Sequence, residues 1–378
     1  MTPFPTLGIL GGGQLGKMMA LAAARMNVNA RFLAPRDAGP MSTFADCTVA
    51  DWTAAHVLRP FAEGCDAVTV ESEWAPAGPM SEVLPDETAL WPAPGTVGVI
   101  KHKGRQMTRL RKAGLPLPSF RCCRALDEAL AAARDLGYPV VLKQYEGSYD
   151  GYGNATATGD DELRSAWDDL AADDGLLVEN LVSFECELSV LVARRPGGES
   201  IVYPVARTVQ RDHRCHAVEV PARISGEALN EAKRVGREAV DAVEGVGITA
   251  AELFLADDGR ILVNELAPRP HNTGHYTIDA SRASQFENHV RAVLDWPLGD
   301  PSLKAPAAVM VNVLGRRQHT PPDASGLPEA LDVPGASVHV YGKPEVRPNR
   351  KMGHVTVVGD DLGEARERAG QAAERIRL

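Results

Sequence analysis

The sequence is poor in the features that mark several large classes of protein. Its six cysteines form no CxxC pair and no zinc-type spacing, and no apolar run approaches the roughly 20 residues that span a bilayer. Positive charge is also scarce, because 50 acidic residues outnumber 40 basic ones and leave a formal charge of -10. No charged-then-apolar leader precedes the first strand-like run. We therefore expect a cytoplasmic protein with reduced thiols that binds neither nucleic acid nor a membrane.

The apolar content is sufficient for more than one core. Hydrophobic residues make up 44% of the chain, and a length of 378 residues is typical of two or three domains. Apolar strands at 6–10, 30–33 and 67–70 alternate with helical or turn-rich spacers up to a segment near 91–95 that is rich in proline and glycine. This alternation predicts a parallel α/β domain over residues 1–98.

Longer strands dominate the next part of the chain, which we expect to form a second domain over residues 99–303. Runs at 176–179, 185–195 and 201–208 predict antiparallel pairs, because a Pro-Gly-Gly turn separates the last two. A helix is predicted near 226–243. This second part therefore has the α+β character of segregated strands and helices.

Two further strands, at 248–256 and 261–266, are joined by an Asp-Asp-Gly turn and predict a hairpin. Residues 304–378 contain three more strand-like runs, at 307–314, 337–340 and 354–358, and a charged terminal helix. They predict a small third domain.

A glycine-rich turn follows the first apolar run. Gly11, Gly13 and Gly16 have the spacing that lets backbone amides and a helix N-terminus approach a phosphate. Polar Gln14 at the helix entrance also favours a ligand. The alternative is that the glycines only permit a tight turn and close helix packing. A nicotinamide dinucleotide would need an acidic residue after the second strand, where residues 34–35 are alanine and proline, so we expect a phosphate instead.

Two glutamates, Glu252 and Glu265, interrupt the apolar strands of the predicted hairpin. Burying a carboxylate is costly unless a cation or a hydrogen-bond partner meets it. With Asn264 beside one of them, they form an oxygen-ligand set suited to Mg²⁺ bridging nucleotide phosphates. The alternative is a pair of edge-facing glutamates on a half-exposed hairpin. Lys143 ends an apolar strand before a glycine-rich loop, and it is either a solvated strand end or a phosphate-binding lysine.

The segment after the paired glutamates contains two prolines and a concentration of polar donors. Arg269, His271, Asn272 and His275 follow one another closely, which is unusual for a plain surface loop. This segment is predicted to contact a ligand.

Together these motifs resemble one family. The matching segments are 11–18, 71–73, 149–151, 264–276 and 350–354, in the right order along essentially the whole chain. The chain resembles the ATP-grasp superfamily and, within it, the 5-(carboxyamino)imidazole ribonucleotide synthases of purine biosynthesis. The resemblance implies an ATP-grasp architecture of mixed α/β and α+β type. It has an N-terminal Rossmann-like preATP-grasp domain, a two-lobed domain that clamps ATP, and a small C-terminal domain.

The resemblance also implies an activity. In this family ATP and Mg²⁺ support the attack of bicarbonate on the γ-phosphate, which gives carboxyphosphate. The exocyclic amine of aminoimidazole ribonucleotide then takes the carboxyl group. The expected partners are these small molecules and a second copy of the chain in a homodimer.

Individual residues receive roles from the resemblance alone. ATP is expected to contact Lys103, Lys143, Ser148, Tyr149, Asp150, Gly151, Tyr152, Gly153, Asn154, Glu179, Asn180, Leu181, Val182, Glu187, Gln210, Asn264 and Glu265. The ribonucleotide is expected to contact Gly13, Gln14, Leu15, Glu73, Tyr149, Arg269, His271, Asn272, Thr273, Arg350 and Lys351. The expected Mg²⁺ ligands are Glu252 and Glu265, and the expected catalytic residues are Asp150, Arg269 and Lys351.

The sequence departs from the family pattern at four of these positions. Ser148 replaces a glycine, Asn154 replaces a glutamine, and Gln210 stands where a histidine is common. Tyr152 replaces an arginine or lysine, so the central loop lacks a cation that its relatives carry.

Three other functions are compatible with parts of the sequence. One is another ATP-grasp carboxylate-amine ligase, such as a formate-using glycinamide ribonucleotide transformylase. A nicotinamide-dependent oxidoreductase would use the first glycine turn but would leave Glu252 and Glu265 without a role. A catalytically weakened nucleotide-binding homologue would account for the departures in the central loop.

Overall fold

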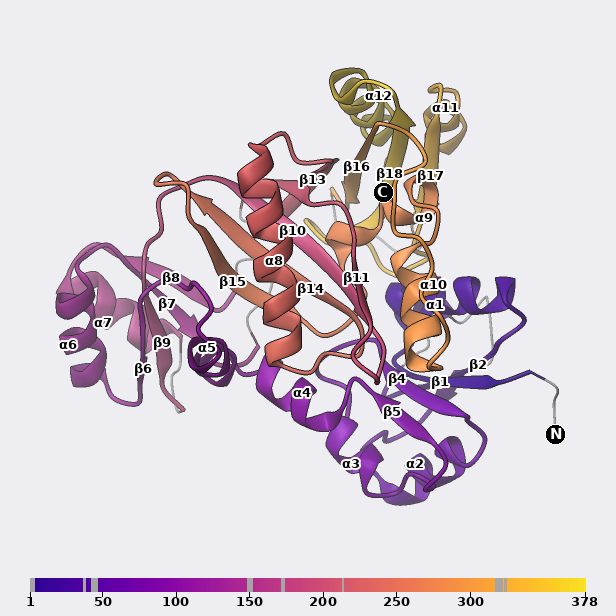
Figure 1. The fold of residues 1–378 in the computed structure, drawn as a ribbon, viewed down its shortest axis with the longest axis horizontal. Helices are drawn as coiled ribbons and strands as arrows, with labels where there is room; N and C mark the ends of the chain where they lie inside the picture. The colour runs from indigo at the N-terminus through magenta and orange to yellow at the C-terminus, as the bar shows by residue number, and fades with distance from the viewer. Residues whose placement is uncertain are drawn as a thin grey trace.

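The computed structural model describes residues 4–36, 39–41, 47–147, 152–170, 174–212, 214–316, 322 and 325–378. The strands of these residues form three sheets, which differ in strand direction (Figure 1). The first sheet is parallel and the other two are antiparallel. The predicted combination of α/β and α+β structure is therefore confirmed.

The N-terminal sheet has five parallel strands in the order β3-β2-β1-β4-β5. Its strands are β1 (Thr6–Leu10), β2 (Asn29–Ala34), β3 (Cys47–Val49), β4 (Ala67–Val70) and β5 (Ala89–Trp91). The helices between and after them are α1 (Gln14–Arg25), α2 (Ala55–Ala62), α3 (Ala77–Ser81) and α4 (Pro94–Ile100), with a 3₁₀ turn at Gly39–Met41. Leu7 and Ile9 share a core with α1, whereas Leu10 and Val70 share one with α2, α3 and α4. Helices thus cover both faces of the sheet.

A small four-stranded sheet follows, in the order β6-β9-β7-β8. Its strands are β6 (Phe120–Cys123), β7 (Val140–Gln144), β8 (Asn154–Ala157) and β9 (Leu176–Asn180). The chain enters it through α5 (Lys103–Lys112), and α6 (Leu126–Leu136) and α7 (Asp160–Asp169) pack against it. The strand at 176–180 pairs with β6 and β7, so the expectation that it pairs with the strand after it is wrong. Pairing partners are set by tertiary packing, which proximity in sequence does not reveal.

The central sheet has nine strands, in the order β15-β14-β10-β12-β13-β16-β18-β17 with β11 beside β10. They are β10 (Phe184–Arg194), β11 (Ser200–Val202), β12 (Ala206–Arg211), β13 (Arg214–Val220), β14 (Gly247–Ala256), β15 (Ile261–Ala267), β16 (Ala307–Leu314), β17 (Ala336–Val340) and β18 (Lys351–Gly359). The single strand expected at 201–208 is two strands. They are separated around Pro204, which cannot donate to a ladder.

The remaining helices join the three sheets. They are α8 (Gly226–Ala242), α9 (Thr277–Ala280), α10 (Gln285–Val293), α11 (Leu327–Leu331) and α12 (Leu362–Arg375), with a 3₁₀ turn at Asn272–Gly274. α8 crosses the face of β10, β14 and β15, α10 packs against α1, and α12 covers β16 and β18 (Figure 1). Because β16 pairs with β13, the C-terminal strands continue the central sheet. Within the described part of the chain, no helix has the length and apolar character needed to cross a membrane.

Candidate active site

A cleft of about 1170 Å³ opens where the three sheets approach one another. The N-terminal sheet contributes Glu73, the small sheet Lys143, the central sheet Glu252, and the segment before β18 Arg350. Residues that are more than 300 positions apart in the sequence therefore face the same space.

Most of the expected site residues line this cleft. They are Gln14, Leu15, Glu73, Lys103, Lys143, Tyr152, Asn154, Glu179, Asn180, Leu181, Val182, Glu187, Gln210, Glu252, Asn264, Glu265, Arg269, His271, Asn272, Arg350 and Lys351. Gly13, Gly153 and Thr273 do not line it. Ser148, Tyr149, Asp150 and Gly151 lie outside the described residues.

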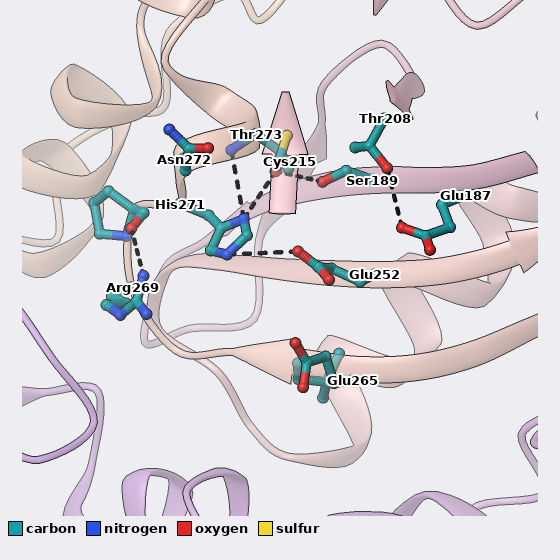
Figure 2. A network of polar contacts seen from close by, with 12 residues as sticks. Glu187, Ser189, Thr208, Cys215, Glu252, Glu265, Arg269, His271, Asn272 and Thr273 are labelled. Carbon is teal, nitrogen blue, oxygen red and sulfur yellow. Dashed lines mark hydrogen bonds and ion pairs between the residues drawn. The ribbon is translucent and has the colours of Figure 1, made fainter. Parts of the chain in front are cut away.

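The paired carboxylates lie directly opposite each other on neighbouring strands. Glu252 of β14 is the register partner of Glu265 of β15 (Figure 2). Removal from water would raise the pKa of Glu265, but the charge and hydrogen bond of Lys103 hold that pKa below its usual range. Removal from water and repulsion by Glu265 instead raise the pKa of Glu252. The hairpin thus holds one carboxylate satisfied by a lysine and a second that is destabilised when charged.

The two lysines expected at ATP each contact a carboxylate. Lys103, at the start of α5, forms an ion pair with Glu265. The Nζ of Lys143 lies 2.6 Å from Glu179 Oε2 and donates to Asn264 Oδ1 over 3.1 Å. The second of these contacts runs from the small sheet to the central sheet. Of the two open interpretations of Lys143, the strand end exposed to solvent is therefore wrong.

His271 links the carboxylate pair to the core of the central sheet. Its Nε2 lies 3.5 Å from Glu252 Oε1, and its Nδ1 lies 2.9 Å from Thr273 Oγ1 (Figure 2). Thr273 Oγ1 in turn lies 2.6 Å from Ser189 Oγ. Removal from water, followed by the charges of nearby Arg269 and Lys351, lowers the pKa of His271 to about 3. The imidazole is therefore neutral, and Thr273 contacts it from behind, outside the lining of the cleft.

An ion pair closes the side of the cleft next to the N-terminal sheet. Arg269 donates from Nε to Glu73 Oε2 over 2.7 Å and from Nη2 to Glu73 Oε1 over 3.3 Å. Removal from water opposes the charge of Glu73, but Arg269 outweighs it and lowers the pKa of Glu73. This two-point contact fixes the guanidinium plane.

The first glycine turn corrects one expectation. Glu71, at the end of β4, accepts hydrogen bonds from the amide of Gly13 over 2.6 Å and from that of Leu15 over 3.1 Å. A Cβ atom on Gly13 would lie 2.3 Å from Glu71 Oε1. A carboxylate of the same chain therefore occupies the amides of Gly13 and Leu15, which are not free for a phosphate as the sequence had led us to expect.

Gln210, which departs from the family pattern, contacts Glu187. Its Nε2 donates to Glu187 Oε2 over 2.6 Å. Thr208 Oγ1 donates to the same oxygen over 3.5 Å (Figure 2). Glu187 is therefore held in place from the neighbouring strand β12.

Some lining residues received no role from the sequence. Lys343 and Arg347 belong to a run rich in basic residues just before β18, which composition alone could have indicated. Arg214 carries no local signal, and Glu71 belongs to a matching segment but received no role, because the contacts of both are with residues far away in the sequence.

Known proteins resemble this chain along its whole length. The chloroplastic phosphoribosylaminoimidazole carboxylase of Vigna aconitifolia is 40% identical to this chain over 94% of its residues. The matched region covers only 64% of that relative's length. The N5-carboxyaminoimidazole ribonucleotide synthase of Synechococcus elongatus is 37% identical, over 98% of this chain and 94% of the relative. The crystal structure of N5-carboxyaminoimidazole synthase from Aspergillus clavatus, in complex with ADP and 5-aminoimidazole ribonucleotide, matches with a TM-score of 0.87 and 32% identity over 100% of both chains.

Family models match the chain in three consecutive parts. They describe a ribonucleotide synthetase preATP-grasp domain over 4–101, an ATP-grasp domain over 108–286 and a phosphoribosylaminoimidazole carboxylase C-terminal domain over 308–368. The fold and these family models thus define an ATP-grasp protein. The chain belongs to the family of N5-carboxyaminoimidazole ribonucleotide synthases.

Proposed function

We propose that this protein carboxylates the exocyclic amine of 5-aminoimidazole ribonucleotide with ATP and bicarbonate. The products are N5-carboxyaminoimidazole ribonucleotide, ADP and phosphate, formed through carboxyphosphate in purine biosynthesis. The observation that carries this proposal is that one cleft is lined by Lys103, Lys143, Glu252 and Glu265. Here the small sheet and the central sheet contact each other. Membership of the family supports the choice of substrates.

The donor set of the β14–β15 hairpin fits Mg²⁺. Removal from water and repulsion by the facing carboxylate of Glu265 raise the pKa of Glu252, so a divalent cation held by Glu252 and Glu265 would relieve an unfavourable arrangement of charges. When bound, Mg²⁺ supplies charge neutralisation for the phosphoryl group in transfer.

The lysines and Arg269 supply the remaining positive charge. Phosphoryl transfer needs little covalent help from a protein and much positioning and electrostatic stabilisation. Lys103 and Lys143 are held by Glu265 and Glu179, which keeps their ammonium groups in place for phosphate oxygens. Arg269, oriented by Glu73, would meet the ribonucleotide or the carboxyphosphate. Neutral His271 lets these cations lie close together without a further positive charge.

The adenine would lie against the segment 179–182. This segment lines the cleft beside Phe184 and Phe254, whose rings stack with centroids 4.8 Å apart and offer an apolar surface. Residues 148–154 would cover the phosphates and keep water from carboxyphosphate. The resemblance to the family is the basis for proposing a cytoplasmic homodimer and the predicted domain bounds 1–98, 99–303 and 304–378.

The test is the formation of ADP with 5-aminoimidazole ribonucleotide, with and without bicarbonate. Full turnover is expected only when both are present. Turnover that depends on formate and glycinamide ribonucleotide would replace this proposal with the transformylase activity. ATP binding without turnover under any of these conditions would identify a catalytically weakened homologue.

A further inference from the structure

Tyr152 and Arg214 meet across the cleft from different sheets. Tyr152 lies just before β8 of the small sheet, and Arg214 begins β13 of the central sheet. The guanidinium carbon of Arg214 lies 5.6 Å from the centroid of the Tyr152 ring, and its Nη2 donates to the tyrosine hydroxyl over 3.4 Å. Both side chains line the cleft.

In the part of the chain that the structure describes, no acidic neighbour neutralises the charge of Arg214 through an ion pair. Lys103, Lys143 and Arg269 each form an ion pair with a glutamate. Among the described residues, no carboxylate forms an ion pair with Arg214, whose Nη1 donates only to the backbone oxygen of Asp212 over 3.1 Å. An aromatic face attracts a guanidinium without neutralising it. Tyr152 therefore orients a cation that keeps its full charge.

We propose that Arg214 binds a phosphate group of a substrate in this cleft and supplies the cation that Tyr152 removed from the central loop. Tyr152 then acts as a positioning residue that holds the guanidinium toward the cleft. This inference rests on the proposed function. In this chain the cation lies on the central sheet, in contact with the tyrosine of the small sheet.

Arg214 lies between the side of the cleft proposed for ATP and the side proposed for the ribonucleotide. Gln210, near it on the paired strand, contacts Glu187 on the side proposed for ATP. The next residue, Cys215, accepts a hydrogen bond over 2.9 Å from Asn312, which pairs with Asn272 on the side proposed for the ribonucleotide. Both substrates carry phosphate oxygens, and a guanidinium binds these in a planar, two-point manner.

Arg214→Gln removes the charge and keeps a polar side chain. Losing one charged hydrogen bond should raise the Michaelis constant of the contacted substrate about 10- to 100-fold and leave that of the other nearly unchanged. The substrate whose constant rises identifies the phosphate. Arg211→Gln is the matched control, because Arg211 is exposed in the same hairpin and does not line the cleft.

Further substitutions at Tyr152 and Arg214 distinguish a role of Arg214 in binding from a merely structural role. Tyr152→Leu should raise the same constant about threefold, and Tyr152→Phe, which keeps the ring but loses the hydroxyl that accepts from Arg214, should raise it less. Adding Tyr152→Arg to Arg214→Gln should restore most of the loss. Arg214→Lys, which keeps the charge, should lose less than Arg214→Gln and serves if the latter folds poorly.

Direct binding distinguishes failure of this inference from failure of the proposed function. The affinities of ADP and of 5-aminoimidazole ribonucleotide, measured by calorimetry, should show the same selective loss in Arg214→Gln. If the wild type turns over but Arg214→Gln matches it in both constants and both affinities, or if Arg211→Gln behaves identically, the inference is overturned. If the wild type turns over no ATP, the proposed function fails, and the affinities still decide the role of Arg214.

Discussion

Two carboxylate sites border the cleft, and they are satisfied in opposite ways. Glu71 is buried and accepts two backbone amides from the glycine turn. Glu265 is partly exposed, faces the carboxylate of Glu252 and forms an ion pair with Lys103. The first site is complete without any ligand. The second contains more negative charge than its own residues neutralise.

The difference shows how to distinguish a buried polar group that stabilises the fold from one that binds a ligand or takes part in a reaction. A polar group whose partners all come from the same chain stabilises the fold, as Glu71 does for the glycine turn. Burial raises the pKa of both Glu71 and Glu252, but Glu71 accepts backbone amides whereas Glu252 faces a second carboxylate, and that arrangement points to a missing cation. The glycine motif was the more conspicuous signal in the sequence, yet the amides of Gly13 and Leu15 are engaged within the fold.

The largest effect is expected at the hairpin. Glu252→Gln and Glu265→Gln each remove a charged oxygen ligand and should lower kcat on the order of 1000-fold, because the metal contributes several kcal/mol. Steady-state ADP formation measures this effect, and circular dichroism checks the fold. Glu185→Gln, at an exposed position near the start of β10, is the control. Near-normal activity in both hairpin variants would remove the basis for a metal there.

Glu71→Gln should instead affect stability. The amide would turn an N–H group toward a backbone N–H and lose a charged acceptor, which should lower the free energy of unfolding by about 1–3 kcal/mol. Urea unfolding measures the loss, with exposed Glu82→Gln as control. If Glu71→Gln keeps wild-type stability but raises the Michaelis constant of the ribonucleotide, the contrast between the two sites disappears.

The dependence of stability on pH should sharpen the comparison. Because folding raises the pKa of Glu252, its contribution is full below the ordinary pKa of a carboxyl group and is lost as the pH rises through the raised value. Without divalent cations, the Tm of the wild type should therefore fall relative to that of Glu252→Gln as the pH rises. Thermal unfolding across pH tests this. Mg²⁺ should raise the wild-type Tm more than the variant's, and parallel curves would argue against the repulsion.

The smallest effect is expected at Glu187, whose carboxylate is held by two neighbours. Gln210→His keeps a donor near Glu187 and should change the Michaelis constant for ATP by about threefold or less. A tenfold increase would show that the glutamine has a role of its own.

The local sequence pattern predicted the strands that consist mostly of apolar residues. The strands at 6–10, 67–70 and 307–314 agree with β1, β4 and β16, because continuous apolar runs need burial on both faces. β13 was not predicted, since its polar residues interrupt the apolar pattern. One of them, Glu219, is buried only because Arg366 of α12 donates to it over 2.5 Å.

The site residues that could be predicted are those whose side chains suggest a chemical role without knowledge of their contacts. The lysines and glutamates of the cleft were found by residue type and family resemblance. The roles of Glu71 and Arg214 depend on contacts with Gly13 and Tyr152, 58 and 62 positions away. Only a tertiary structure brings such pairs together.

The continuous ladder from β15 to β17 has a mechanical consequence. Bending the central sheet would break backbone hydrogen bonds between adjacent strands, so the carboxylate hairpin and the C-terminal strands move as one stiff platform. α10, packed on α1, couples the N-terminal sheet to this platform. Among the described residues the small sheet shares no ladder with this platform, so we expect it to be the part that moves when the cleft opens or closes. Such a movement would carry Tyr152 relative to Arg214.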